Sequence, residues 1–156
     1  MQNAPHPAPE IRIHRFDELS AAEFHDLLKL RFDVFILEQQ SLYPEIDGED
    51  KAALHLVAED AQGAPCGTLR ILGADGSGPL CIGRVAVRPD HRGTGLGRKM
   101  MNAALAHLRE IAPDRAVHLG AQQHLETFYA SFGFERISNV YDDGGIPHID
   151  MEKAPS

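Results

Sequence analysis

The sequence predicts a single α/β domain of the α+β type, built around a mostly antiparallel sheet. Three observations support this prediction. Short runs of alternating apolar and polar residues are typical of half-buried strands. Turn-forming glycines and prolines separate several of these runs at hairpin spacing, and longer segments carry apolar residues at helical spacing. A chain of 156 residues, 43% of them hydrophobic, is long enough to bury one core, which we place in residues 11–156.

The first part of the chain is expected to begin with a disordered, proline-containing tail over residues 1–10. A strand is predicted at Ile11–Phe16. The capping-box sequence SAAE, from Ser20 to Glu23, then starts a helix that runs to about Glu38. The following segment, QQSLYPEIDGED, has no periodicity and is predicted to be a carboxylate-rich loop or a short distorted helix.

The second part of the chain contains three more predicted strands in succession, ALHLVAED, CGTLRILG and LCIGRVAV. The turns between them indicate an antiparallel meander. A long amphipathic helix is predicted from Gly95 to Ile111, before Pro113. A strand in AVHLGAQ, a helix in LETFYASF that ends at Gly133, and short strands in ERIS and PHIDMEK complete the expected elements.

Composition narrows the classes of function. With 15 basic and 23 acidic residues, a broadly basic surface for nucleic acids or anionic membranes is not expected. Cys66 and Cys81 lie in apolar strands and are expected to be buried free thiols. The histidines show no paired metal-ligand spacing, so no metal is predicted. No segment has the length and apolar character of a membrane span, and a cytoplasmic location is expected.

The segment RGTGLG, from Arg92 to Gly97, is the strongest functional signal. It lies between a predicted strand and a predicted helix, where free backbone amides and the helix dipole favour an anion. Glycines let the backbone approach phosphate oxygens and adopt positive φ angles. The spacing fits neither a P-loop nor a dinucleotide-binding fingerprint. The alternative interpretation is a tight turn whose glycines only satisfy local geometry.

Longer stretches around this turn point to a family. VAVRPDHRGTGLGRKMM resembles the acyl-CoA-binding motif of the GNAT superfamily of N-acetyltransferases, and FYASFGF resembles its second signature. The order of the predicted elements is also similar to that fold, so the resemblance implies a mixed, mostly antiparallel central sheet flanked by helices on both faces. LRFDVFILEQQSLYPEIDGED and GIPHIDM resemble the ElaA-like subgroup of small bacterial proteins.

The resemblance implies an N-acetyltransferase that moves an acetyl group from acetyl-CoA to a primary amine of an unidentified small molecule or peptide. The strand before the turn would pair with the pantetheine amides, and the turn itself would bind the pyrophosphate. A glutamine stands near the position where many relatives have a coenzyme-binding asparagine. The expected coenzyme-binding residues are Val85, Ala86, Val87, Arg92, Gly93, Thr94, Gly95, Leu96, Gly97 and Gln122. A homodimer formed by exchange of C-terminal strands is a further hypothesis.

The catalytic candidates follow from the same resemblance. Tyr129 matches the superfamily tyrosine that protonates the coenzyme thiol, and a tyrosine pKa of about 10 is near that of a thiol; packing in the core is the alternative role. Some GNAT enzymes use a strand glutamate as base, but Pro79–Val87 contains no carboxylate. The remaining candidates are loop carboxylates, as base or as binding groups for a cationic acceptor, and one strand histidine: Glu38, Glu45, Asp47 and His118. A solvated acidic loop is the alternative for the carboxylates.

Two other functions stay open at this point. LRFDVF followed by EIDGED also resembles the acyl-homoserine lactone synthases, which are longer and lack a clear RGxGxG turn. A non-catalytic acyl-CoA sensor would keep the glycine-rich turn without a base.

Overall fold

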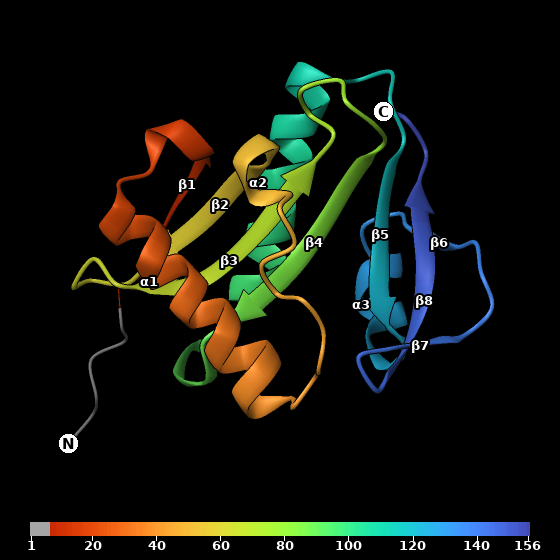
Figure 1. Cartoon of the computed structure of the whole chain (residues 1–156). Coiled ribbons are helices and arrows are strands. Elements are labelled where there is room, and N and C mark those ends of the chain that lie inside the picture. Colours follow the sequence, from red (N-terminus) through yellow and green to blue (C-terminus); the bar gives the residue numbers. More distant parts are fainter. Residues whose placement is uncertain (1–6) are drawn as a thin grey trace.

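The computed structural model describes residues 7–156 and contains one mixed sheet between two layers of helices (Figure 1). Of the tail predicted over residues 1–10, residues 1–6 lie outside the described residues, and Glu10 already belongs to the first strand. The strands are β1 (Glu10–Arg15), β2 (Leu54–Glu59), β3 (Pro65–Leu72), β4 (Leu80–Val87), β5 (Val117–Gln122), β6 (Glu135–Arg136), β7 (Tyr141–Asp143) and β8 (Ile146–Lys153). The α-helices are α1 (Ala21–Phe32), α2 (Leu96–Ile111) and α3 (Glu126–Ala130).

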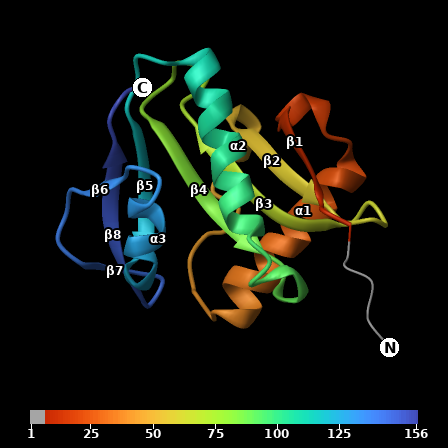
Figure 2. The ribbon, with the colours of Figure 1, turned by 180° about the vertical axis from the view of Figure 1, so that it is seen from behind.

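The sheet has the order β1-β2-β3-β4-β5-β8-β6, with β7 paired to β8. Strands β2 to β4 form the predicted antiparallel meander, and β1 pairs with β2, also antiparallel. The pair of β4 and β5 is parallel, because α2 provides the crossover that connects them. Helix α1 covers one face, whereas α2 and α3 cover the other, as the view from behind shows (Figure 2). The predicted α+β fold with helices on both faces is therefore confirmed.

The main core lies between the sheet and α2. One stripe of α2 is buried, as its apolar spacing predicts, and packs against buried residues of the central strands. The buried residues of this stripe include Met100, Met101, Ala104 and Leu108. In residues 7–156, no helix combines the length and the apolar character needed to cross a membrane.

Three local features differ from the sequence predictions. The first helix is α-helical only to Phe32 and continues to Glu38 as the wider π-helical segment η2 (Asp33–Glu38), a change that apolar spacing does not reveal. Strand β7 was not predicted, because its three residues are all exposed and show no alternation. The last helix is also shorter than predicted at both ends, since η5 (Gln123–Leu125) precedes it and residues 131–133 form a turn.

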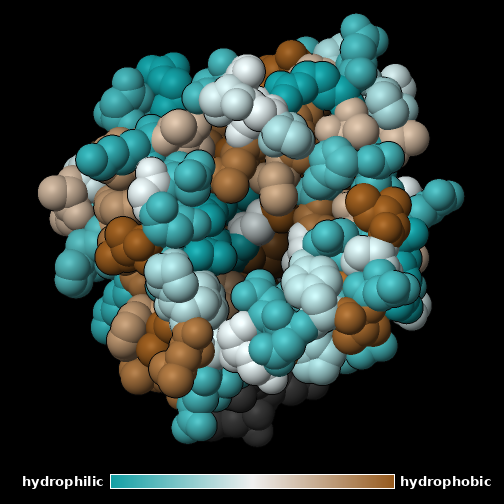
Figure 3. Space-filling model, turned by 45° about the vertical axis from the view of Figure 1, so that its right-hand side comes forward, coloured by the Kyte–Doolittle hydropathy of each residue, from teal (hydrophilic) through white to brown (hydrophobic). Residues whose placement is uncertain are grey.

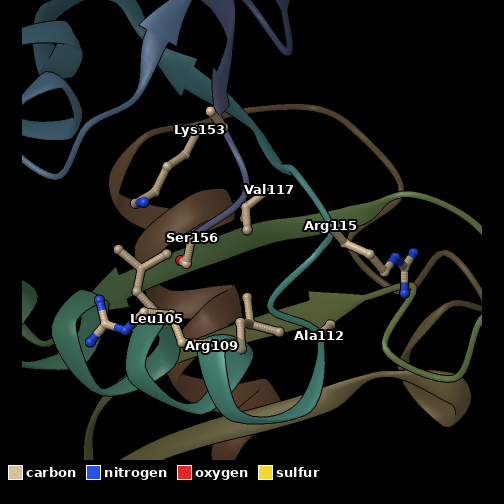
Figure 4. A pocket seen from close by; sticks show the side chains of 9 residues that line it. Leu105, Arg109, Ala112, Arg115, Val117, Lys153 and Ser156 are labelled. Carbon is tan, nitrogen blue, oxygen red and sulfur yellow. The ribbon is translucent and has the colours of Figure 1, made fainter.

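The C-terminus packs against the end of α2 and closes a small pocket. The backbone amide of Ser156 donates to the carbonyl of Pro113 at 3.1 Å. Figure 4 shows Arg115 turned away from this pocket, and its guanidinium donates to the carbonyls of Gly73 and Gly78. The pocket holds about 10 Å³, roughly the space of one water molecule. It is too small for an organic ligand.

Candidate active site

Strands β4 and β5 separate along their length and leave a wedge in the sheet. They pair only over Leu80–Ile82 and Val117–Leu119. Beyond that point β4 continues to Val87, paired on one side with β3. Arg84 has a φ of 51°, and the register with β3 shifts around it, so a bulge turns the strand there. The other edge of β4 offers main-chain donors and acceptors to an extended ligand.

The glycine-rich turn, residues 92–97, connects the end of this edge with α2. Gly93 and Gly95 have φ angles of 73° and 83°, and apart from the adjacent residues no atom of the described chain lies within 4 Å of the Cβ position at either residue. Gly95 is the N-cap of α2 and supplies no side-chain hydrogen bond. The first amides of a helix have no partner inside the helix, and the helix dipole favours an anion there. The turn therefore has both the space and the donors for a phosphate group.

The other residues of the turn and strand that were predicted to bind the coenzyme offer a ligand mainly their backbone groups. The side chains of Ala86 and Leu96 are buried, so only their main chain can contact a ligand. Thr94 donates its hydroxyl hydrogen to the carbonyl of His91 at 2.6 Å and so braces the turn.

Arg92 is bound to a neighbouring carboxylate. Its guanidinium donates to the two carboxylate oxygens of Glu38 at 2.6 and 2.7 Å, and to the carbonyl of Val87 at 3.0 Å. The hydrogen bond from Arg92 lowers the pKa of Glu38. A carboxylate with a lowered pKa is a weaker base, so this geometry does not favour Glu38 as the catalytic base.

Helix α3 is held against the start of α2. The guanidinium of Arg98 lies 4.9 Å from the ring centre of Phe132 and 5.4 Å from that of Phe128. A Cβ on Gly97 would lie 3.7 Å from the Phe128 ring. This packing positions Tyr129, the next residue of α3, relative to the glycine-rich turn.

A cavity of about 250 Å³, which we call the wedge cavity, occupies the space between β4 and β5. Its walls include Val85 on the open edge of β4, Tyr129 from the face that carries α3, and Tyr43 and His148 from the opposite face. Figure 3 shows a hollow on the side of the molecule turned toward β5 and β8, with hydrophilic side chains around it. The open edge of β4 therefore runs from this cavity, which Tyr129 lines, toward Val87 and the glycine-rich turn that follows.

Two predicted residues lie in the wall of the wedge cavity beyond β4. Tyr129 is 6% exposed, and burial raises its pKa to about 12, so its hydroxyl keeps its proton at neutral pH. This value lies above the one of about 10 that the sequence argument assumed. Gln122, at the end of β5, donates from its side-chain amide to the Gln39 carbonyl oxygen at 3.1 Å. Cys81 is half-buried because it also lines this cavity, whereas Cys66 is buried as predicted.

The acidic loop is bound to the sheet by arginines, and its carboxylates do not form an acidic pocket. Three carboxylates meet three arginines in what we call the arginine–carboxylate cluster: Arg31, Arg70, Arg84, Glu45, Asp47 and Asp50. The hydrogen bond from Arg70 is the main cause that lowers the pKa of Asp47. Asp47 is therefore poorly suited to act as a base or to bind a cationic acceptor. The arginines come from α1, β3 and β4, so no local sequence signal connects them with the loop.

His118 does not lie in the wedge cavity. Its Nδ1 is 3.5 Å from a carboxylate oxygen of Glu152, and it lines a neighbouring cavity of about 480 Å³. Among the described residues, His148 is the histidine that lines the wedge cavity, and it was not among the residues predicted from the sequence. It lies in the segment GIPHIDM, which shows the family resemblance and part of a predicted strand but no catalytic signal, and the β7–β8 hairpin brings it to the wedge.

Comparisons with known proteins agree with this geometry. Residues 19–155 match the family model described as "Acetyltransferase (GNAT) domain". Protein ElaA of Escherichia coli strain K12 is 38% identical over 138 residues, which cover 87% of this chain and 90% of ElaA. The crystal structure of Escherichia coli ElaA has a TM-score of 0.87 at 37% identity and covers 93% of this chain and 99% of that one.

Two further solved structures share this fold. An acyl-CoA N-acyltransferase from Pseudomonas aeruginosa has a TM-score of 0.88 at 35% identity and covers 94% of this chain and all (100%) of that one. The acyl-homoserine lactone synthase LasI has a TM-score of 0.74 at only 16% identity, which shows a shared fold and nothing more specific. With a matching family model over most of its length, the chain belongs to the GNAT acetyltransferase family and is ElaA-like.

Proposed function

We propose that this protein is an N-acetyltransferase that transfers the acetyl group of acetyl-CoA to a primary amine. The observation that carries the proposal is the succession of three features: the uncapped start of α2, the open edge of β4, and the wedge cavity that Tyr129 lines. An anion site, a strand edge and a hydrogen-bond donor follow one another in the order that a diphosphate, a pantetheine arm and a thioester require.

In this proposal the main chain binds most of the coenzyme. The amides from Gly93 to Gly97 would hold the diphosphate, and the edge from Val85 to Val87 would pair with the two pantetheine amides. Arg92 would exchange part of its ion pair with Glu38 for a phosphate oxygen. Gln122 lines the wall of the wedge cavity, and its side-chain amide would exchange its hydrogen bond to Gln39 for one to the bound arm.

The chemistry requires an amine to attack the thioester carbonyl while the carbon–sulfur bond breaks. With a pKa of about 12, Tyr129 is a poor source for complete proton transfer. A thiol pKa is about 8.5, and the difference of about 3.5 units corresponds to roughly 5 kcal/mol. Tyr129 therefore donates a hydrogen bond to the departing thiolate, and the sulfur receives its proton from the attacking nitrogen.

A matched pair of substitutions tests the coenzyme site. Gly95→Asn and Gly95→Asp add side chains of nearly equal size at the same positive φ, which Asn and Asp both tolerate. Only the aspartate adds a charge, and two like charges about 4 Å apart repel by about 1 kcal/mol in water and about 4 kcal/mol near a protein surface. Acetyl-CoA should bind the Asp variant at least about fivefold more weakly than the Asn variant. Equal affinities in calorimetry would place the diphosphate elsewhere.

A turnover assay tests the transfer itself. The protein is incubated with acetyl-CoA and a panel of primary amines. The released CoA thiol is measured, and the mass of the product is determined by mass spectrometry. Tyr129→Phe should keep acetyl-CoA binding and lower turnover by about 100-fold, the usual effect of one transition-state donor. Binding without amine-dependent CoA release would support the sensor function, and a lactone product would support the synthase function.

A further inference from the structure

The two ring nitrogens of His148 have different environments. Nδ1 lies 2.8 Å from the carbonyl oxygen of Ile146. A carbonyl oxygen can only accept a hydrogen bond, so Nδ1 carries the hydrogen, and in the neutral ring Nε2 has the free lone pair. The half-buried side chain lines the same wedge cavity as Tyr129. The backbone of the β7–β8 hairpin thus selects the tautomer of a histidine in the cavity wall.

The ring of His148 is also held in place. Tyr141 lies directly opposite on β7, with ring centres 6.0 Å apart and planes inclined by 28°. The Tyr141 hydroxyl donates to Asp150 at 2.6 Å. It lies over Gly120, where a Cβ would approach it to 3.1 Å, so a larger residue would displace it. Tyr141 is therefore a positioning residue for His148.

The other ionisable side chains of the wedge cavity are less suited to take a proton from an amine. The two arginines stay protonated at all relevant pH values. Burial raises the pKa of the tyrosines and of the cysteine, so these groups hold their protons at neutral pH. An aspartate on β7 is exposed, and aspartate is in general a weaker base than histidine. These side chains are Arg70, Arg84, Tyr43, Tyr129, Cys81 and Asp143. On the neighbouring strand β5, the residue paired with His148 is the uncharged Gln122.

We propose that His148 is the general base that removes a proton from the acceptor amine. Nε2 takes one proton from the ammonium group, and the freed nitrogen attacks the acyl carbon. The carbon–sulfur bond breaks, the second nitrogen proton passes to the sulfur beside Tyr129, and the imidazolium returns its proton to water. This inference rests on the proposed acetyl transfer, and it provides the base that β4 lacks.

The variant His148→Asn tests this role. Asparagine keeps an N–H group for the Ile146 carbonyl but has no basic nitrogen. We expect kcat/KM at pH 7 to fall by about 100-fold, the range of general-base catalysis, with the acetyl-CoA thermal shift unchanged. Wild-type kcat/KM should show a step in its pH profile and decline as the pH falls and the general base becomes protonated. The variant should lose that step and approach the wild-type rate at high pH, where more of the amine is neutral.

Three controls make the result decisive. Asp143→Asn should keep the pH step, since that carboxylate is not the base. Tyr141→Phe keeps the stacked ring, loses the bond to Asp150, and should lower kcat/KM less than His148→Asn. Nitrogen-15 NMR of the histidines should show neutral His148 protonated at Nδ1, a result that does not depend on activity.

The possible failures are distinguishable. If the wild type acetylates an amine and His148→Asn keeps both its rate and its pH step, the inference is wrong and the proposed function stands. A neutral ring protonated at Nε2 would also overturn the inference. If no amine accelerates CoA release by the wild type, the proposed function fails, and the role of His148 fails with it.

Discussion

Replacing Arg31 by methionine tests whether the arginine–carboxylate cluster holds the acidic loop over the wedge. Arg31 is 1% exposed, and its guanidinium contacts Glu45 at 2.5 Å and Asp50 at 2.8 Å. Methionine keeps most of the buried apolar stem but removes the charge. The cluster would change from three positive and three negative groups to two positive and three negative groups.

The expected loss of stability is about 3 kcal/mol. Removing one partner of a buried ion pair generally costs about 3–5 kcal/mol, because a buried charge is left uncompensated. Here Arg84 remains 3.0 Å from Glu45 and Arg70 remains 3.1 Å from Asp50, which favours the lower end of that range. In a domain of this size 1 kcal/mol shifts the unfolding midpoint by about 2–4 °C. The midpoint should therefore fall by about 6–12 °C.

Urea unfolding and differential scanning calorimetry measure this effect. The double variant Arg31→Met/Glu45→Gln restores the charge balance and should lose less stability than the two single variants combined. Arg12→Met removes an arginine whose ion pair with Glu10 is exposed, and it should leave the midpoint unchanged. A loss of less than about 1 kcal/mol for Arg31→Met, as for a surface ion pair, would refute the reasoning.

Three further predictions follow from named contacts. The hydrogen bond from Arg70 lowers the pKa of Asp47 in the folded state. The stabilisation from ionised Asp47 is therefore complete above the unfolded pKa of about 4 and is lost as the pH falls below that value, toward the lower folded-state pKa. Acid titration followed by circular dichroism measures this loss. Glu38→Gln removes the charge that competes for Arg92 and should tighten acetyl-CoA binding by about two- to fivefold in calorimetry; weaker binding would contradict this. Gly73 has a φ of 81°, and a Cβ there would overlap the main chain of its own turn, so Gly73→Ala should cost more than about 2 kcal/mol in urea unfolding.

The local elements of this protein could be predicted from its sequence because their signals lie within a few residues. The capping box forms as expected, with Ser20 accepting from the Glu23 amide at 3.1 Å and Glu23 accepting from the Ser20 amide at 2.9 Å. The apolar stripe of α2 faces the sheet. The glycine-rich turn has the positive φ angles that its glycines suggest, at Gly93 and Gly95. Each of these features depends on spacing along one stretch of chain.

The composition of the wedge cavity was decided only by the tertiary structure. Separation of β4 from β5 opens the cavity, and it follows from how whole strands twist and pair, which no short segment encodes. Tyr129 and His148 stand 19 positions apart in the numbering, on α3 and β8, and meet in one cavity wall only after the sheet has formed. From the sequence, Asp47 is expected to be a free carboxylate, but in the structure Arg70, 23 residues away in the chain, donates a hydrogen bond to it. Charge and acidity depend on neighbours in space, and chain folding brings those neighbours together from distant parts of the sequence.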